Sequence, residues 1–151
     1  MQILENAIMK LRKPYGFLSN MAACNVAFDG VEYNSIEHAY QAARSLAPVY
    51  RTKVQMSQNP VWAKRMGKGA KTREDWSEVK VDVMLELLRA KFSAEKFRVK
   101  LLATGEAFIA EGNQHGDRFW GMVPDEQGEL VGENWLGRLL MKVREEIRCA
   151  S

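Results

Sequence analysis

A long amphipathic helix is the strongest structural signal in this sequence. Apolar side chains recur at helical spacing from Trp76 to Phe92, and the preceding Thr72-Arg73-Glu74-Asp75 has the pattern of a capping box. The stripe consists of Trp76, Val79, Val83, Met84, Leu87, Leu88 and Phe92. We therefore expect the longest element of the fold to be a helix over these residues.

Shorter helices are expected on both sides of this segment. N-cap residues, a proline at the first helical position and glycine stops indicate their boundaries. The expected helices run from Asn34 and Ser35 to Leu46, from Asn59-Pro60 to Gly67 and Gly69, from a Ser93 cap to Thr104-Gly105, and from an Asn134 cap along the apolar face Leu136, Leu139, Leu140, Val143 and Ile147.

A few short strands complete the expected fold. Residues 26–33 have the pattern of a hairpin that turns at Asp29-Gly30. Residues 107–111 and 119–123 resemble strands on either side of a polar loop at 112–118, and a turn-rich stretch follows at 124–128. No repeat or linker divides the 151 residues, so we expect a single domain over residues 1–151, mainly α with a few short strands (α+β).

The chain is mildly basic, with 22 Lys and Arg against 19 Asp and Glu and a formal net charge of +3. This balance suits a phosphate-bearing ligand and is far from that of a protein that coats DNA. The two cysteines, Cys24 and Cys149, belong to no Cys-x-x-Cys or Cys/His cluster, so neither a metal site nor a disulfide framework is expected. We expect a cytoplasmic protein that is neither exported nor inserted in a membrane, since no apolar run approaches the length of a span.

Three polar residues mark one edge of the first expected helix. Glu37, Gln41 and Arg44 fall at i, i+4 and i+7, which makes Glu37 a candidate pocket acid. The alternative is structural, because Asn34 and Glu37 have the spacing of an N-cap and its reciprocal acid. His38 is expected to be a packed or surface histidine rather than a ligand.

Two lysines allow either a solvated or a binding role. Lys91 falls between Leu88 and Phe92, near the apolar stripe, where a lysine usually extends its ammonium to solvent. The alternative is an ammonium held at a pocket wall to meet phosphate. Lys64 allows the same two interpretations, and a solvated face is favoured by the cations that follow it, Arg65, Lys68, Lys71 and Arg73.

The loop between the two strand-like pieces places acids beside an aromatic ring. Glu111 precedes the loop, Asp117 lies near its end, and Trp120 follows. Glycoside chemistry uses a protonated acid for the leaving group, an ionised acid for oxocarbenium charge or water, and a ring that stacks on a base. Trp76 and Trp120 are the candidate rings; the alternatives are a core residue for Trp76 and a half-buried strand residue for Trp120. No P-loop, Rossmann glycine motif or Gly-x-Ser-x-Gly elbow is present.

A set of short motifs occurs in a fixed order along the chain. The motifs are Tyr15-Gly16-Phe17-Leu18-Ser19-Asn20-Met21, Ser35-Ile36-Glu37-His38-Ala39-Tyr40-Gln41, Ala63-Lys64-Arg65-Met66-Gly67, Trp76, Met84 through Lys91-Phe92, Leu101-Leu102-Ala103-Thr104-Gly105, Glu111, Asp117, Trp120-Gly121, Gly132-Glu133-Asn134-Trp135-Leu136-Gly137 and Leu140-Met141-Lys142-Val143-Arg144. Over roughly residues 15–146 this order resembles the YbiA-like or NADAR domain family, named for NAD and ADP-ribose. The link at 112–116 is longer than usual in that family, and the turn at 124–130 does not align.

The resemblance implies a compact, mainly helical fold and an N-glycosidase that needs no cofactor or metal. In one branch of the family the substrates are phosphoribosylamino-pyrimidine intermediates of riboflavin biosynthesis, and in another ADP-ribose is removed from guanine in DNA. The resemblance places four residues in the active site, Glu37, Asp117, Trp76 and Trp120. It implies substrate binding by Asn20, Lys64, Lys91 and Asn134, to which we add Gln41 and Arg44 from the polar helix edge.

We expect the ribosyl group to bind between the helix that carries Glu37 and the loop that carries Asp117. Its phosphate would be neutralised by Lys64, Lys91 and Arg44. Glu37 is the favoured proton-transfer group, because desolvation raises the pKa of a first-turn glutamate that faces an apolar cleft. Asp117, on a polar loop, is expected to stay ionised, and the two roles could be exchanged.

Two other classes of function are alternatives. A binding module for ADP-ribose or NAD would use the same rings and cations but would need no pair of acids. A nucleic-acid-binding protein without enzymatic activity is less expected, because the net charge is small and no clustered basic stripe is evident, although a DNA-borne substrate fits a weakly basic surface. The oligomeric state is not predicted.

Overall fold

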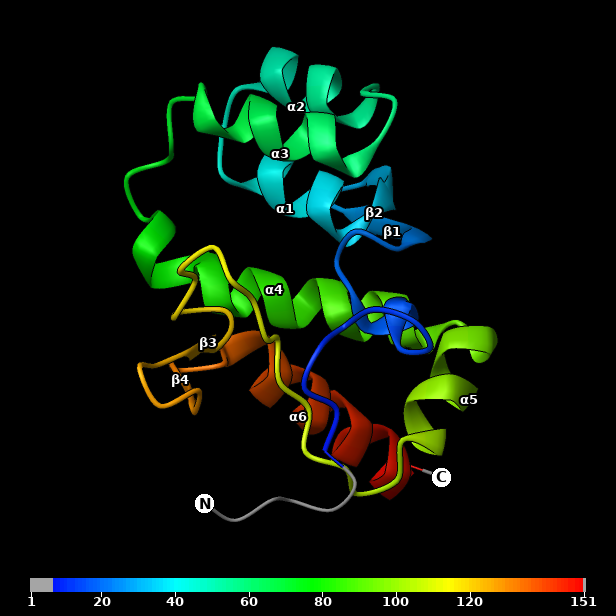
Figure 1. Ribbon diagram of the computed structural model, residues 1–151. Coiled ribbons are helices and arrows are strands. Elements are labelled where there is room, and N and C mark those ends of the chain that lie inside the picture. Colours follow the sequence, from blue (N-terminus) through cyan, green and yellow to red (C-terminus); the bar gives the residue numbers. More distant parts are fainter. Residues whose placement is uncertain (1–6, 151) are drawn as a thin grey trace. The chain divides into compact units, whose positions relative to one another are not determined.

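The computed structural model describes residues 7–150 as two units, which are taken in turn (Figure 1). Residues 20–93 form the first unit, which we call the hairpin unit. Residues 7–19 and 94–150 form the second, which we call the terminal unit.

The hairpin unit begins with two antiparallel strands, β1 (Ala23–Phe28) and β2 (Val31–Ser35). The turn between them consists of Asp29 and Gly30, whose φ values of 49° and 77° both lie in the left-handed region. The type I′ two-residue hairpin turn requires this conformation at both positions, and the hairpin predicted at residues 26–33 is confirmed.

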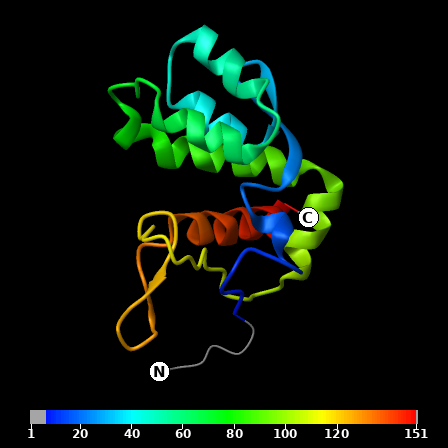
Figure 2. The same ribbon diagram turned by 45° about the horizontal axis from the view of Figure 1, so that its top comes forward.

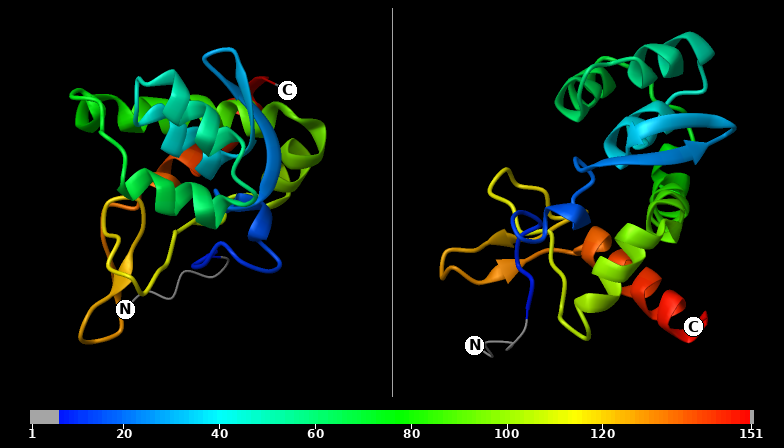
Figure 3. Two further views of the ribbon diagram at one scale, coloured as in Figure 1. Left: turned by 90° about the horizontal axis from the view of Figure 1, so that it is seen from above. Right: turned by 90° about the vertical axis from the view of Figure 1, so that its right-hand side faces the viewer.

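Four helices follow the hairpin, and the first of them is central. They are α1 (Ile36–Ala43), α2 (Pro48–Gln55), α3 (Pro60–Lys68) and α4 (Trp76–Ser93). Figure 1 shows α1 between the α2–α3 pair and α4, and α1 also contacts both strands (Figure 3). All eight residues of α1 are buried, so every polar side chain on this helix is an internal group.

The predicted long helix is confirmed as α4, which buries Trp76, Val83, Met84, Leu87, Leu88, Lys91 and Phe92. The capping box predicted at its start is wrong. The Arg73 guanidinium donates to both carboxylate oxygens of Asp75 at 2.6 and 2.9 Å, while the Thr72 hydroxyl accepts a hydrogen bond from Arg44. The predicted Ser93 cap is also wrong, because the Ser93 hydroxyl donates back to the Ala90 carbonyl at the end of α4.

The helix α2 was not predicted, and α1 ends at Ala43 rather than at Leu46. Proline at the start of α2 is a helix-start signal, but Val54 is the one buried side chain of this helix. Without an apolar stripe, a helix shows little periodicity in its sequence. By contrast, α3 begins as predicted, because the Asn59 side chain accepts a hydrogen bond from the Trp62 backbone N–H at 3.0 Å.

Arg51 on α2 ties three parts of the hairpin unit together. Its Nε donates to the backbone carbonyls of Ser45 at 2.7 Å and Ala42 at 3.2 Å, at the end of α1. Its Nη1 donates to the Asp29 carboxylate at 2.8 Å, in the hairpin turn. One guanidinium thus joins α2 to α1 and to the β1–β2 turn.

In the terminal unit, α5 (Glu95–Ala103) packs against α6 (Trp135–Ala150), and the short 3₁₀-helix η1 (Gly16–Leu18) contacts α5. The predicted face of α6 is confirmed in the buried Leu136, Leu139, Leu140 and Val143. The strands β3 (Val123–Pro124) and β4 (Leu130–Val131) form a hairpin that lies next to the start of α6 (Figure 2).

The two strands predicted at residues 107–111 and 119–123 are wrong. The first segment forms a single bridge between Ile109 and Ile8, and a second isolated bridge joins Gly112 to Met122. Of the second predicted segment, Val123 alone belongs to a strand. Each bridge consists of two backbone hydrogen bonds and is not extended into a ladder, so no continuous strand forms.

Within residues 7–150 the structure contains six α-helices and two two-stranded sheets, and the predicted fold class, mainly α with a few short strands, is confirmed. None of the helices in this range is both long and apolar enough to cross a membrane. The extent of the domain, residues 1–151, stays a prediction.

Candidate active site

Glu37 lies in the first turn of α1, where the sequence allowed two explanations for it. The N-cap of α1 is Ser35, whose Oγ accepts a hydrogen bond from the backbone N–H of His38 at 3.0 Å. Because Asn34 is not the cap, its predicted capping partnership with Glu37 is wrong. The buried His38 ring lies 2.7 Å from Ser35 Oγ and 3.2 Å from the Ser57 carbonyl oxygen, which confirms that it is a packed histidine.

The predicted polar edge of α1 is a chain of hydrogen bonds. Gln41 Nε2 donates to Glu37 Oε1 at 2.8 Å, and Gln41 Oε1 in turn accepts from Arg44 Nη1 at 3.1 Å. Arg44 Nη2 donates to the Thr72 hydroxyl at 3.3 Å. The amide of Gln41 therefore orients the Glu37 carboxyl and is itself oriented by Arg44.

The Glu37 carboxyl is buried, with 8% of the residue exposed. This burial raises the pKa of Glu37 above the usual carboxyl value, because the charged form loses its water. The Gln41 hydrogen bond and the nearby Lys64, His38 and Arg44 act in the opposite direction and only reduce the shift. A carboxyl in this state keeps its proton to a higher pH than one in water and can donate it to a leaving group.

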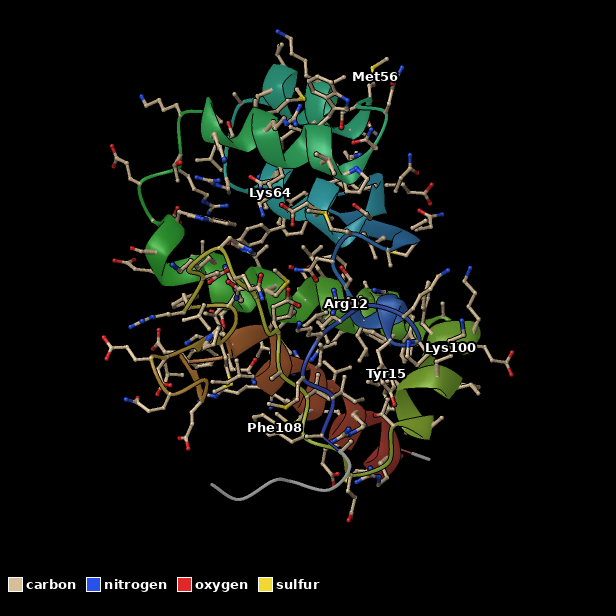
Figure 4. All side chains as sticks on the ribbon, in the orientation of Figure 1. Arg12, Tyr15, Met56, Lys64, Lys100 and Phe108 are labelled. Atoms are coloured by element: carbon tan, nitrogen blue, oxygen red, sulfur yellow. The ribbon has the colours of Figure 1, made fainter. Side chains whose placement is uncertain are left out.

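Helix α3 contributes a cation and a close contact to this site. The exposed Lys64 is near enough to Glu37 for its charge to lower the pKa of that carboxyl (Figure 4). A methyl group added at Gly67 would collide with the amide oxygen of Gln41. The absence of a side chain at Gly67 thus leaves the space that Gln41 occupies. We call Glu37, Gln41, Arg44 and Lys64 the Glu37 cluster.

Asn20 contacts the start of α1 through its backbone. Its carbonyl oxygen accepts a hydrogen bond from the Glu37 N–H at 3.0 Å, and its Nδ2 lies 3.7 Å from Met84 Sδ. Its side-chain oxygen Oδ1 is buried and has no hydrogen-bond partner among residues 7–150. Asn20 thus holds an unused acceptor one backbone hydrogen bond away from Glu37.

Trp76 begins α4 and packs on Tyr40 of α1, one turn after Glu37. The two ring centroids are 5.0 Å apart with an angle of 55° between the ring planes, and both residues are buried. Trp76 is therefore a core residue, as the alternative interpretation of the sequence expected. Its role as a ring that stacks on the substrate stays a prediction. Tyr40, which the sequence reasoning did not single out, supports the Trp76 ring.

Lys91 is 1% exposed, so the expectation that its ammonium reaches solvent is wrong. Burial lowers the pKa of Lys91 from 10.5 to about 8, and the nearby Cys24 raises it by a smaller amount. The ammonium lies 5.2 Å from the centre of the Phe92 ring. Lys91 is therefore an internal lysine of the hairpin unit.

In the terminal unit, Asp117 organises its own loop. Its Oδ1 accepts hydrogen bonds from the backbone N–H groups of Phe119 at 3.1 Å and Trp120 at 2.9 Å. The Asn113 side chain accepts from the Asp117 N–H at 3.0 Å and donates to the Asp117 carbonyl at 2.9 Å. Asn113 lies in the long link at 112–116 and was not predicted to matter. The half-buried Trp120 packs edge-on against Phe119, with ring centroids 5.0 Å apart.

Asn134 fixes the backbone of residues 109–111. Its φ of 53° is left-handed, its Nδ2 donates to the Ile109 carbonyl at 2.9 Å, and its Oδ1 accepts from the Glu111 N–H at 3.0 Å. Its side chain therefore does not cap α6, contrary to the prediction. Both ends of the amide bond the backbone, so the geometry gives Asn134 a structural role and adds no support to its predicted role in substrate binding.

The structure thus brings four of the predicted site residues together as the Glu37 cluster, with Asn20 joined through its backbone. Asp117, Trp120 and Asn134 belong to the other unit, and their joint action with Glu37 stays a prediction. Across the described residues, no three His, Cys, Asp or Glu side chains meet as a metal ion would need.

An oriented, buried acid with a cation nearby can protonate a departing nitrogen or oxygen, as hydrolysis of a glycosyl bond requires. The chain belongs to the NADAR domain family, and the NADAR domain matches residues 8–148. The family predicted from the ordered motifs is therefore confirmed.

Individual relatives agree with this assignment. The protein called N-glycosidase YbiA of Shigella sonnei is 38% identical over 136 residues, which cover 88% of this chain and 82% of that protein. Riboflavin biosynthesis protein VVA0006 of Vibrio vulnificus is 35% identical over 89% of this chain and 36% of its own length. The NMR structure of Escherichia coli YbiA superposes with a TM-score of 0.79 at 34% identity, over 99% of this chain and 89% of that one. The predicted enzyme class, a hydrolase of N-glycosyl bonds, is confirmed.

Proposed function

We propose that this enzyme hydrolyses the N-glycosidic bond of phosphoribosylamino-pyrimidines, the intermediates of riboflavin biosynthesis. The observation that carries the proposal is the buried Glu37 carboxyl, which Gln41 orients at 2.8 Å and whose pKa is raised by burial. The names of the relatives support the substrate, since one is called an N-glycosidase and another a riboflavin biosynthesis protein.

In the proposed reaction the bond between C1′ of the ribose and the exocyclic nitrogen breaks. The nitrogen takes the proton of the Glu37 carboxyl and leaves as the free amino-pyrimidine. Water adds to C1′ of the oxocarbenium ion and gives the phosphorylated sugar. The proton released by the water passes to solvent, and Glu37 is reprotonated from solvent. Asp117 stays the predicted second acid.

Lys64 is the cation of the Glu37 cluster that we assign to the phosphate. It is exposed and forms no ion pair with any residue between 7 and 150. Arg44 already donates to Gln41 and Thr72, so we assign it to positioning rather than to the substrate. The unused Oδ1 of Asn20 would accept a hydrogen bond from a sugar hydroxyl.

A paired release assay tests the proposal. The purified enzyme is offered a phosphoribosylamino-pyrimidine and, separately, DNA that carries ADP-ribose on guanine. Glu37→Gln removes the acid without changing its shape, and Glu78→Gln, exposed in the first turn of α4, is the matched control. We expect the first substrate alone to be cleaved and Glu37→Gln to lower turnover by about 100-fold or more.

Three outcomes would change the conclusion. Cleavage of the modified DNA alone would make the enzyme a DNA de-ADP-ribosylase. Binding of ADP-ribose without release from either substrate would favour the binding module. Near-normal turnover in both Glu37→Gln and Asp117→Asn would refute the two acids as catalytic groups.

A further inference from the structure

The positive charge of this chain is concentrated in one segment. Between residues 44 and 73 there are eight Lys and Arg and no Asp or Glu, whereas the remaining 121 residues contain 14 Lys and Arg against 19 Asp and Glu. The small net charge of +3 therefore averages a strongly basic segment with an acidic remainder. The basic segment contains α2 and α3.

Five of these cations point to solvent. Lys53, Lys64, Arg65, Lys68 and Lys71 are exposed, and none of them is ion-paired with any part of the chain that the structure describes. The other three are engaged, since Arg51 and Arg73 pair with carboxylates and Arg44 belongs to the Glu37 cluster. Unpaired surface cations attract a polyanion and release its counterions on binding.

A groove with one exposed indole lies within this segment. Its volume is about 450 Å³, and it is lined by Lys53, Met56, Ser57, Gln58, Trp62 and Met66 (Figure 4, where Met56 is labelled). Trp62 and Met56 are 51% and 75% exposed, although both are large and apolar. The Arg65 guanidinium lies 5.1 Å from the centre of the Trp62 ring.

We propose that this α2–α3 face binds a single-stranded nucleic acid. An exposed indole in a groove offers a stacking surface for an unpaired base, and a neighbouring arginine adds cation–π attraction. Lys53 lines the groove and the exposed Lys68 lies further along α3, and both would supply ammonium groups for phosphates. A duplex hides the faces of its bases, and a membrane surface offers no ring to stack, so a single strand fits both features.

This surface is separate from the proposed hydrolysis. Trp62, Lys53 and Lys68 are outside the Glu37 cluster, and substitutions there are expected to leave release from the small substrate unchanged. Failure of the surface proposal would therefore leave the proposed function intact, and failure of the proposed function would leave the surface proposal intact.

Fluorescence anisotropy with labelled oligo(dT) of about 20 nucleotides tests the proposal on the full chain. The variants are Trp62→Ala and the double variant Lys53→Glu with Lys68→Glu. The matched control reverses two exposed charges on α5, Lys96→Glu with Arg98→Glu. We expect Trp62→Ala to weaken binding about tenfold, and the double variant of the α2–α3 face to reduce the slope of log affinity against log salt by about 1.4 or more. The far-UV circular dichroism spectrum, compared with that of the wild type, reports whether each variant is folded.

Equal losses in the α5 control would overturn the proposal, because the attraction would then be general. A labelled DNA duplex of the same length is measured in parallel, and its binding as tightly as oligo(dT), with no effect of Trp62→Ala, would also overturn the proposal. So would binding of phosphatidylserine vesicles or polyglutamate in preference to oligo(dT), since the partner would then be a membrane or an acidic protein.

Discussion

Replacing the buried Lys91 by Met is expected to make the folded protein more stable at neutral pH. Burial lowers the pKa of Lys91 from 10.5 to about 8, and a pKa difference of one corresponds to about 1.4 kcal/mol between the two protonation states. Holding the charged lysine inside therefore costs about 3 kcal/mol. Methionine has a similar length and no charge, but the substitution also removes the contact of the ammonium with the Phe92 ring. We expect a net gain of about 1–3 kcal/mol in the free energy of unfolding at pH 7.

The pH dependence gives this prediction its sign. The pKa of Lys91 is lower in the folded state than in the unfolded state, so its unfavourable contribution is absent above pH 10.5. The contribution grows as the pH falls from 10.5 to about 8 and is complete below that value. The advantage of Lys91→Met over the wild type should therefore be large at pH 7 and should shrink towards zero near pH 10.5.

Urea unfolding of both proteins at several pH values between 7 and 10.5 measures this difference. Lys96→Met is the matched control, because Lys96 is exposed and its substitution should change stability by less than about 0.5 kcal/mol. Groups that titrate in both proteins cancel in the comparison. If Lys91→Met is less stable than the wild type at pH 7, or if the difference does not change with pH, the buried charge is not the source of the effect.

Three further substitutions test other contacts. Gly67→Ala should displace Gln41, lower turnover and reduce the free energy of unfolding in urea by about 1–3 kcal/mol. Gly69→Ala should have none of these effects, because the nearest atom to an added methyl is 3.8 Å away. Glu37→Gln should be more stable than the wild type at pH 7 but not at pH 3, because the raised pKa of Glu37 makes the wild type lose stability as the pH rises. If thermal unfolding gives the same difference in stability between the two proteins at both pH values, Glu37 is not a buried acid. Asn134→Ala should cost about 3 kcal/mol in the free energy of unfolding with KM unchanged, because two backbone groups lose their partners; a raised KM with unchanged stability would instead assign Asn134 to the substrate.

Local signals explain the parts of the fold that were predicted from the sequence. The β1–β2 hairpin follows from Asp29-Gly30, and α3 follows from the Asn59 cap, because each depends on residues next to one another in the chain. The apolar residues of the segment at 107–111 resemble a strand in the sequence. Its backbone groups instead form hydrogen bonds with the backbone of Ile8 and the side chain of Asn134, which are distant in the sequence. Contacts of that kind leave no periodic pattern.

In the candidate site, too, local spacing was predictable and contacts between elements were not. The spacing of Glu37, Gln41 and Arg44 predicted one polar edge, and these three side chains are hydrogen-bonded in that order. The approach of Gly67 to Gln41 was not predictable, because it depends on how α3 packs against α1. The burial of Lys91 was missed for a similar reason: a lysine beside an apolar stripe extends to solvent unless other elements cover it.

The bonds of Arg51 have a consequence for how the hairpin unit opens. Its guanidinium bridges the β1–β2 turn and the last carbonyls of α1, so neither segment can separate from α2 without breaking bonds to the same group. These three elements should therefore behave as one cooperative folding unit, whose backbone amides exchange with deuterium at a common rate. Truncating Arg51 to Ala would divide that unit, and the hairpin amides would then exchange faster than those of α1.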